Sequence, residues 1–367
     1  MVAVLRRVGS TLVEGLDATL IIATLLLAAV GLATLYSASH DSPTRLNGQL
    51  VNFSVAFAAM WVAARMSPEM LMRMALPAYA IGLMLLVAVA LYGEKVNGAT
   101  RWLHVGITRI QPSEMMKLAL PLMLAWYFAR NEGALRLRDF AVGAVLVAVP
   151  VLLIARQPDL GTAVLVAAAG AYILYFAGIG WRVIGLLTVV GGASLFPLWG
   201  MLHDYQRRRV LTLLDPSQDP LGAGYHTIQS TIAVGSGGIF GKGWLQGTQA
   251  HLEFIPERHT DFIFAVYSEE FGLLGNCVLL GLYILLIGRG LVIAAQAASL
   301  FSRLLAGAVT LMFFTYAFVN MGMVAGILPV VGVPLPLISY GGTALVTLFI
   351  GIGILMSLRR QRRLVPT

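Results

Sequence analysis

Charged residues are scarce in this sequence: of its 367 residues only 11% are Asp, Glu, Lys or Arg, whereas 58% are hydrophobic. A soluble domain of this length would not bury so much apolar surface, and many apolar runs approach the ~20 residues that a helix needs to span a bilayer. The one cysteine, Cys277, excludes an internal disulfide framework. The composition therefore predicts an all-α polytopic membrane protein.

The sequence also lacks a basic stripe with interleaved aromatic residues, so its net charge of +8 does not indicate nucleic-acid binding. Its basic residues form short clusters between apolar runs, which is the pattern of a membrane-orientation signal. Arg6 and Arg7 precede an apolar run at about residues 17–38. This run is long for the apolar region of a signal peptide, and no small-x-small cleavage site follows it, so we expect a retained first helix.

Ten apolar spans are predicted to cross the membrane as helices. They lie at roughly residues 17–38, 48–65, 71–92, 113–130, 139–155, 160–179, 183–202, 262–288, 302–324 and 342–358. Joining them in order places fourteen of the 25 basic residues on one side, namely Arg6, Arg7, Arg65, Arg73, Arg130, Arg136, Arg138, Arg182, Arg289, Arg303, Arg359, Arg360, Arg362 and Arg363. The positive-inside rule makes that side cytoplasmic, and both termini then lie inside.

The segments on the opposite, extracytoplasmic side carry nearly all of the unusual sequence. They are residues 93–112, 156–159, 203–261 and 325–341. The connection at 203–261, between the seventh and eighth spans, holds four of the six histidines, and loops of this length are usually functional or disordered. Because Phe240, Trp244, Phe254 and many glycines are not a disordered composition, we expect an ordered, partly re-entrant loop within a single domain of residues 1–367.

Two predicted helices begin on the extracytoplasmic side with similar motifs. The fourth span opens with Gln111-Pro112-Ser113-Glu114, and the sixth opens with Gln157-Pro158-Asp159. Proline followed by an acid suits a helix N-terminus, so Glu114 and Asp159 could simply complement helix dipoles. Lys117 favours a different interpretation, because it shares a helical face with Glu114. A charged pair one turn into a membrane helix should face an aqueous cavity or a polar partner.

Basic residues on this side are more numerous than the orientation rule allows for short loops. They are Arg101, Arg109, Arg156, Arg207, Arg208, Arg209, Lys242 and Arg258. Guanidinium groups bind phosphate oxygens bidentately and a lysine supplies a compact charge, so an anionic headgroup at the outer leaflet would account for them. The alternative is that Arg207, Arg208 and Arg209 form a solvated or interfacial helix face.

Nucleotide and zinc motifs are missing from the sequence. The glycine-rich residues 235–243 lack the Lys-Ser or Lys-Thr of a phosphate-binding loop, so close backbone approach or a flexible gate is the better interpretation. The histidines show neither an HExxH pattern nor paired ligands one turn apart, which disfavours zinc. A Mg²⁺ or Mn²⁺ ion held by Asp261 and phosphate oxygens stays open, because such ions need few protein carboxylates.

Asp261 stands where the charged run 255–261 meets the apolar eighth span. An ionised carboxylate is costly there unless something uses it. Helical spacing places Asp261, Ala265 and Glu269 on one stripe. Glu269 and Glu270 lie deeper in the span, and we expect one of them to lock helix packing through a hydrogen bond.

Several motifs, spread over nearly the whole chain, form a specific combination. They lie at residues 97–103, 111–117, 157–163, 205–216, 256–261 and 334–342. On these motifs the sequence resembles the SEDS proteins (shape, elongation, division and sporulation). The segment 332–337 resembles the form found in the subgroup that acts in cell elongation.

The resemblance implies a ten-helix peptidoglycan glycosyltransferase that polymerises lipid II at the outer face of the bacterial cytoplasmic membrane, with a class B penicillin-binding protein as partner. Such an enzyme joins the 4-hydroxyl of one lipid-linked disaccharide to the anomeric carbon of another and expels a polyprenyl diphosphate. The site needs a base for the hydroxyl and positive charge for the diphosphate. By this resemblance Asp261 is the essential acid, either as base or as the holder of a metal ion, and Glu114 and Lys117 are a cavity pair. The expected substrate-binding residues are Arg101, Arg109, Glu114, Lys117, Arg156, Asp159, Arg207 and Lys242.

Functions from other classes compete with this one, first a flippase for lipid-linked precursors and second a secondary transporter of small solutes. A transporter should place its charges near the bilayer midplane on paired broken helices, whereas here they concentrate at one face. A flippase needs an inward-open path, and the cytoplasmic loops are short and merely basic. A purely structural scaffold would leave Asp261, Glu114 and Lys117 unexplained.

Overall fold

The computed structural model describes residues 16–39, 42–96, 99–105, 108–133, 135–201, 207, 211, 223–252, 254, 255 and 257–360. The chain is mostly helical, and a helix lies at each of the ten predicted apolar spans. These helices are α2 (Ala18–Ala38), α3 (Pro43–Arg65), α4 (Pro68–Tyr92), α5 (Pro112–Arg130), α6 (Leu137–Arg156), α7 (Leu160–Phe176), α8 (Trp181–Met201), α12 (Ile263–Ala295), α13 (Leu300–Val324) and α14 (Thr343–Arg360).

Helix starts follow from residues that can satisfy free backbone groups. The Asp17 carboxylate accepts a hydrogen bond from the backbone N–H of Leu20 at the start of α2, and the Ser67 hydroxyl accepts one from Met70 at the start of α4. Proline occupies the first turn of α3, α4 and α5, where a missing N–H leaves no bond unmade. The start of α3 reaches beyond its predicted span, because hydropathy does not register a polar turn at a helix end, and α12 continues past Arg289 to Ala295.

Seven of the described helices are long and apolar enough to cross a membrane, namely α2, α3, α4, α6, α12, α13 and α14. Of the others, α7 has only 17 residues, and α5 carries the charged residues Glu114 and Lys117 in its first two turns. The chain is therefore a multi-pass membrane protein.

The prediction of an all-α fold is wrong at one place. Between α4 and α5 the chain forms β1 (Glu94–Val96), β2 (Ala99–Val105) and β3 (Thr108–Ile110), which pair antiparallel in the order β1-β2-β3. Strands this short give little sequence signal, although each of the three contains at least one β-branched residue. The central strand β2 packs on α4 and α5, so the sheet lies over the start of α5.

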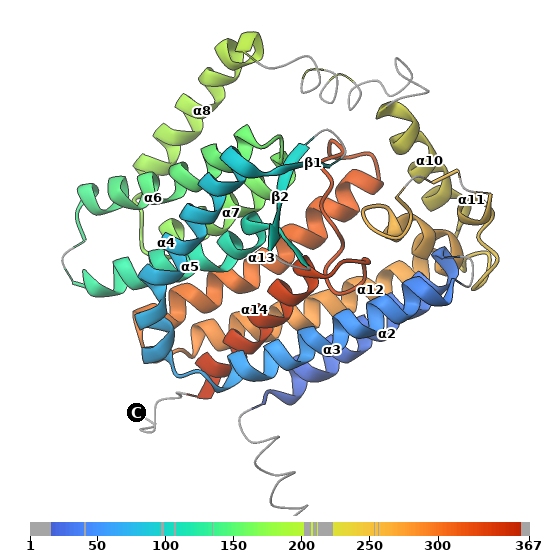
Figure 1. The fold of residues 1–367 in the computed structure, drawn as a ribbon, viewed down its shortest axis with the longest axis horizontal. Helices are drawn as coiled ribbons and strands as arrows, with labels where there is room; N and C mark the ends of the chain where they lie inside the picture. Colours follow the sequence, from blue (N-terminus) through green and yellow to red (C-terminus); the bar gives the residue numbers. More distant parts are fainter. Residues whose placement is uncertain are drawn as a thin grey trace, which may run out of the picture.

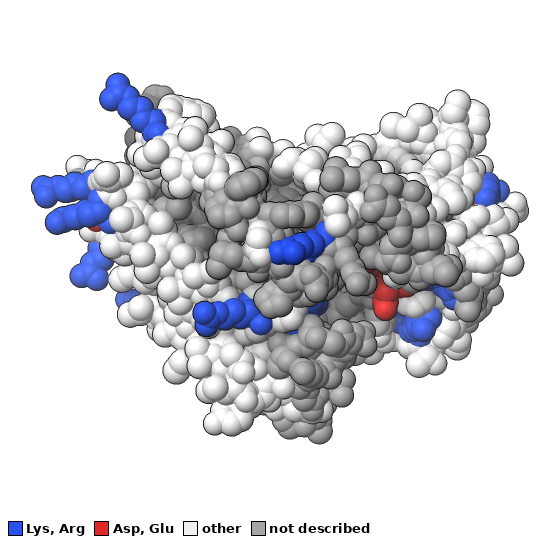
Figure 2. All heavy atoms as spheres, turned by 90° about the horizontal axis from the view of Figure 1, so that it is seen from above, with Lys and Arg blue, Asp and Glu red and all other residues white. Residues whose placement is uncertain are grey.

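Helix α13 lies at the centre of the bundle, where it contacts α5, α7, α10, α12 and α14 (Figure 1). Burial follows this arrangement: 72% of the most apolar window of α13 is buried, compared with 28% for α4 and 22% for α6. The exposed side chains of the outer helices are largely apolar, including Leu91, Val189 and Ile284. On the face drawn in Figure 2, the described residues form wide uncharged areas with separate basic side chains among them.

The start of the first described helix, α2, and the end of the last one, α14, lie on the same side of the helical bundle. Asp17, before α2, accepts hydrogen bonds from Arg289 near the end of α12, and it lies 2.7 Å from a guanidinium nitrogen of Arg359 at the end of α14. Burial alone would raise the pKa of Asp17, but the hydrogen bonds from Arg289 and Leu20 and the charge of Arg359 hold it below its ordinary value. The predicted grouping of Arg289 and Arg359 on one side is thereby confirmed.

Part of the predicted 203–261 loop is ordered into α10 (Ala223–Ser236) and α11 (Thr248–His251). Helix α10 packs on α12 and α13, and its Ser230 hydroxyl donates to the Val324 carbonyl at the end of α13. His203, Arg208 and Arg209, on which some predictions fell, lie outside the described residues.

The glycine-rich residues between α10 and α11 pack into a kink of α12. Gly272 has φ +62° inside α12, so the helix is interrupted there, and the freed groups bond to the glycine-rich turn. The backbone N–H groups of Lys242 and Gly243 donate to the carbonyls of Glu269 and Glu270, and Leu273 donates to Gly238. A Cβ on Gly241 would overlap the Glu270 carbonyl, which confirms the prediction of close backbone approach.

We expect Gly272→Ala to lower the free energy of unfolding by roughly 2 kcal/mol or more, because alanine is strained at this φ and its Cβ would meet the backbone of Gly241. Gly281→Ala, also in α12, is the matched control, since no heavy atom lies within 4 Å of the added methyl group. Thermal unfolding of the two purified variants in detergent measures the difference. Equal melting temperatures would contradict the role given to the kink.

Candidate active site

The buried pair Glu114 and Lys117 lies near the start of α5. The Lys117 ammonium is 2.5 Å from Glu114 Oε1, one turn earlier on the same helix. Their side chains are only 1% and 7% exposed. The pair therefore has a polar partner inside the protein, which is one of the two environments expected for it from the sequence.

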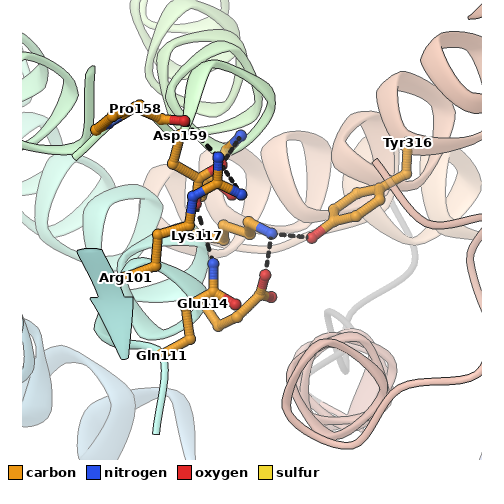
Figure 3. A network of polar contacts seen from close by, with 8 residues as sticks. Arg101, Gln111, Glu114, Lys117, Pro158, Asp159 and Tyr316 are labelled. Atoms are coloured by element: carbon orange, nitrogen blue, oxygen red, sulfur yellow. Dashed lines mark hydrogen bonds and ion pairs between the residues drawn. The ribbon is translucent and has the colours of Figure 1, made fainter. Parts of the chain in front are cut away.

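That partner is Tyr316 of α13, which the sequence analysis missed. The Lys117 ammonium donates a hydrogen bond to the Tyr316 hydroxyl, and it lies 4.8 Å from the centre of the tyrosine ring (Figure 3). Tyr316 is fully buried. A tyrosine in an apolar span needs a hydrogen-bond partner for its hydroxyl, so the sequence could have indicated that Tyr316 has a polar contact. The sequence does not identify that partner.

A second polar group joins the two Gln-Pro motifs. Asp159 caps α7 by accepting from the backbone N–H of Thr162, which agrees with its interpretation as a helix cap. Its other oxygen accepts from the side-chain amide of Gln111, at a distance of 3.0 Å. Arg101 of β2 lies 3.9 Å from Asp159 and also donates to the Pro158 carbonyl. The starts of α5 and α7 and the sheet are thus tied together around one buried carboxylate.

Asp261 lies in the turn before α12, and its backbone is held by neighbouring elements. The side-chain amide of Asn320, in α13, donates to the Asp261 carbonyl at 2.8 Å and to the Val333 carbonyl at 2.7 Å. The Ser339 hydroxyl donates to the carbonyl of Thr260. Gly332 leaves room for the acid, since a Cβ there would lie 3.2 Å from Asp261 Oδ2.

The Asp261 carboxylate differs from the other two acids of the site in its environment. It is half-buried, and among the described residues no hydrogen bond or ion pair engages its carboxylate oxygens. Burial and the charges of Glu257 and Asp159 raise the pKa of Asp261 to about 6, against the opposing charge of Arg101. Asp261 therefore lies within electrostatic reach of the Arg101–Asp159 pair, and the sequence-predicted residues Arg101, Glu114, Lys117, Asp159 and Asp261 gather in one region.

Two other predicted binding residues, Lys242 and Arg207, have partners outside this group. Lys242 pairs with Glu269 of α12 at 2.7 Å and also donates to Thr248. Arg207 donates to the Gly200 carbonyl at the end of α8. Arg156 is exposed in the last turn of α6, and the side chain of Arg109, in β3, lies outside the description.

Glu269 and Glu270 have structural partners. Glu269 accepts from Lys242 and from the backbone N–H of Gln249, and Glu270 accepts from the Ser37 hydroxyl of α2. The prediction that one of them locks helix packing through a hydrogen bond is confirmed by the contact between Glu270 and Ser37.

Among the described residues around Asp261, the donor set does not fit a resident metal ion. In the part of the chain that the structure describes, no group of three His, Cys, Asp or Glu side chains is arranged to hold one. Asp159, the neighbouring acid, is already engaged by Gln111 and Thr162. His226 instead stacks on Phe262, with 5.7 Å between the ring centres.

Comparisons with known proteins cover nearly the whole chain. Residues 17–364 match the family of cell cycle proteins that includes FtsW, RodA and SpoVE. The chain is 50% identical over 351 residues to the peptidoglycan glycosyltransferase MrdB of Escherichia coli K12, covering 95% of each protein.

Solved structures agree with the sequence comparisons. The crystal structure of the rod shape determining protein RodA of Thermus thermophilus has 30% identity and a TM-score of 0.72, covering 95% of this chain and 97% of that one. A chain from a peptidoglycan synthase complex, studied for its coordination of polymerization and crosslinking, has 34% identity and a TM-score of 0.83 over 95% of this chain and 99% of that one.

We expect Lys117→Met to destabilise the protein by about 3 kcal/mol or more, because it leaves the buried Glu114 carboxylate without its cation. The double variant Lys117→Met with Glu114→Gln should regain much of this loss, since the remaining side chain is neutral. Melting temperatures of the two variants in detergent provide the test. A double variant less stable than the single one would show that Glu114 is held by other partners.

Proposed function

The chain belongs to the FtsW, RodA and SpoVE family of cell cycle proteins and is a peptidoglycan glycosyltransferase of its RodA subgroup, and we propose that Asp261 is the general base of the reaction. The substrate is lipid II, which the enzyme polymerises into glycan strands. The observation that supports this role for Asp261 is the contrast among the three clustered acids: Glu114 is engaged by Lys117, Asp159 is engaged by Gln111 and Thr162, and no described residue engages the carboxylate of Asp261.

The proposed reaction is a single displacement at the anomeric carbon of the donor. The 4-hydroxyl oxygen of the acceptor sugar forms the new bond as the bond from the anomeric carbon to the diphosphate oxygen breaks. The hydroxyl proton passes to the Asp261 carboxylate, and the bonding electrons leave with the polyprenyl diphosphate. An α-linked donor gives a β-linked product, as a single inversion requires. Diphosphate leaves without needing a proton, so one carboxylate is enough, unlike the two of ordinary glycoside hydrolysis.

The pKa of Asp261 suits this role. A base works best when its pKa lies near the operating pH, because it is then mostly ionised and still holds a proton well. Burial and the negative charge of Glu257 bring the pKa of Asp261 to about 6. Its half-buried position at the mouth of α12 leaves one side open to a hydroxyl group.

Positive charge for the diphosphate comes from Arg101 and Lys117 in this proposal. The Arg101 side chain is 32% exposed, so its guanidinium can contact phosphate oxygens directly. Lys117 is buried behind the surface, where a fixed charge acts more strongly than in water. Glu114 holds Lys117 in place.

The membrane arrangement is part of the proposal. All ten helices at the predicted spans would cross the bacterial cytoplasmic membrane, with both termini inside. The side of Asp17, Arg289 and Arg359 would be cytoplasmic, because basic residues concentrate there. The sheet, α10, α11 and Asp261 would then face outward, where lipid-linked precursors are polymerised.

A class B penicillin-binding protein is the partner we propose, in line with the synthase complex that contains a similar chain. A Mg²⁺ or Mn²⁺ ion would enter only with the phosphate oxygens of the substrate, since the described residues do not fit a resident ion. No step of the proposed reaction depends on it.

Asp261→Asn is expected to reduce glycan polymerisation by roughly 100-fold or more, because the reaction loses its base. The variant should remain folded: the native protein holds the Asp261 proton more tightly than an ordinary carboxylate of pKa 3.8, so ionisation costs stability as the pH rises through about 6. Its melting temperature at pH 8 should therefore not fall below that of the wild type.

The assay uses purified protein and lipid II, with and without the partner and divalent cations, and glycan-strand length is the readout. Glu257→Gln, which removes an exposed carboxylate four residues away, is the control and should polymerise normally at pH 8. Normal polymerisation by Asp261→Asn would exclude the proposed base. Absence of polymer from the wild type under every condition would favour a flippase.

The polymerisation rate should fall about tenfold for each pH unit below about 6, because only the ionised Asp261 accepts the proton. Glu257→Gln removes a negative charge that raises this pKa, so its acid limb should move to lower pH. Rates measured from pH 4.5 to 8 with saturating lipid II test both points. An acid limb that stays in place in Glu257→Gln would mean that another group titrates.

A further inference from the structure

Tyr316 is the one buried partner that links Lys117 to a second helix among the described residues. An ammonium group has three hydrogens to donate. Lys117 uses one on Glu114 Oε1, in its own helix, and one on the Tyr316 hydroxyl, in α13. With its side chain 1% exposed, Lys117 depends on such acceptors, because burying a charge is costly unless it is paired.

The contact with Tyr316 restricts where the ammonium can lie. A lysine side chain has a flexible four-carbon stem, so one acceptor on its own helix leaves it several positions. A second acceptor on α13 removes that freedom, and the tyrosine ring adds a cation–π contact at 4.8 Å. Figure 3 shows the Tyr316 hydroxyl facing the Lys117 ammonium, and the negative charges of Glu114 and Asp159 also act on this hydroxyl.

We propose that Tyr316 is a positioning residue for glycosyl transfer, which holds the Lys117 ammonium beside the diphosphate leaving group. This inference rests on the proposed function. Tyr316 itself is fully buried, so in this proposal its whole effect on the reaction passes through Lys117.

A fixed cation at this place acts on the transition state more than on the substrate. As the bond to the anomeric carbon breaks, negative charge grows on the diphosphate, and a pre-positioned ammonium stabilises the extra charge. Interactions that strengthen only in the transition state raise kcat and leave KM nearly unchanged. The released polyprenyl diphosphate carries the same extra charge, so it should also sense Lys117.

Tyr316→Phe tests the inference, because it keeps the ring and removes only the oxygen. We expect kcat for lipid II to fall on the order of 10-fold with KM changed less than about 2-fold. The matched control is Tyr79→Phe: Tyr79 is also a buried tyrosine, but its hydroxyl donates to the Leu146 carbonyl of α6 at 2.7 Å and does not accept from Lys117. Its melting temperature should drop similarly, but its kcat should not.

A binding measurement makes the test independent of residual activity. The dissociation constant for polyprenyl diphosphate is measured in detergent for wild type, Tyr316→Phe, Lys117→Met, Lys117→Gln and the double variants of Tyr316→Phe with each. We expect Tyr316→Phe to weaken binding about 10-fold in the wild type and to add nothing once Lys117 is replaced. The inference would be overturned if Tyr316→Phe weakened binding equally with Lys117 present and with Lys117 replaced. It would also be overturned if Tyr316→Phe and Tyr79→Phe had the same kcat per folded enzyme. Failure of the proposed function is a different result, since it would appear as an active Asp261→Asn enzyme.

Discussion

The buried ion pair between Lys117 and Glu114 constrains both the fold and the site. A lysine inside a helical bundle destabilises the protein by several kcal/mol unless its charge is compensated. Here compensation comes from the preceding turn of α5 and from Tyr316 of α13. Because α13 also contacts α7, α12 and α14, the helix that stabilises this charge is the one around which the bundle is organised. The charge can therefore be kept only if the helices pack in this arrangement.

The three acids of the site have different roles because they have different partners. Glu114 neutralises a buried cation, and Asp159 satisfies a helix start, an amide and, at longer range, a guanidinium. Asp261 has none of these partners and is affected mainly by burial and by like charge, which raise its pKa. A carboxylate in this condition takes up a proton more readily than an ordinary carboxylate, and this property suits a base.

Hydropathy predicted the helices well because a span of apolar residues has few alternatives in a membrane. The similarity of the two Gln-Pro motifs also corresponds to a contact between them, since the Gln111 amide donates a hydrogen bond to Asp159. Periodicity does not say which helices touch, however, and so it could not find Tyr316 as the partner of Lys117 or Glu269 as the partner of Lys242. The small sheet was missed for a related reason: three short strands are stabilised by pairing with one another, which no single strand reveals.

The position of Asp261 depends on contacts that lie outside its own helix. Three consecutive carbonyls, of His259, Thr260 and Asp261, accept hydrogen bonds from Tyr340, Ser339 and Asn320 respectively. Further along α12, the kink at Gly272 receives the glycine-rich turn, so this helix is held at two places. A base must lie within hydrogen-bonding reach of the proton it takes, and a displacement of about 1 Å can cost 100-fold in rate. Since the backbone of Asp261 is fixed in this way while its carboxylate is left without a described partner, the remaining freedom is that of one short side chain, and the substrate hydroxyl is the group that completes its hydrogen bonding.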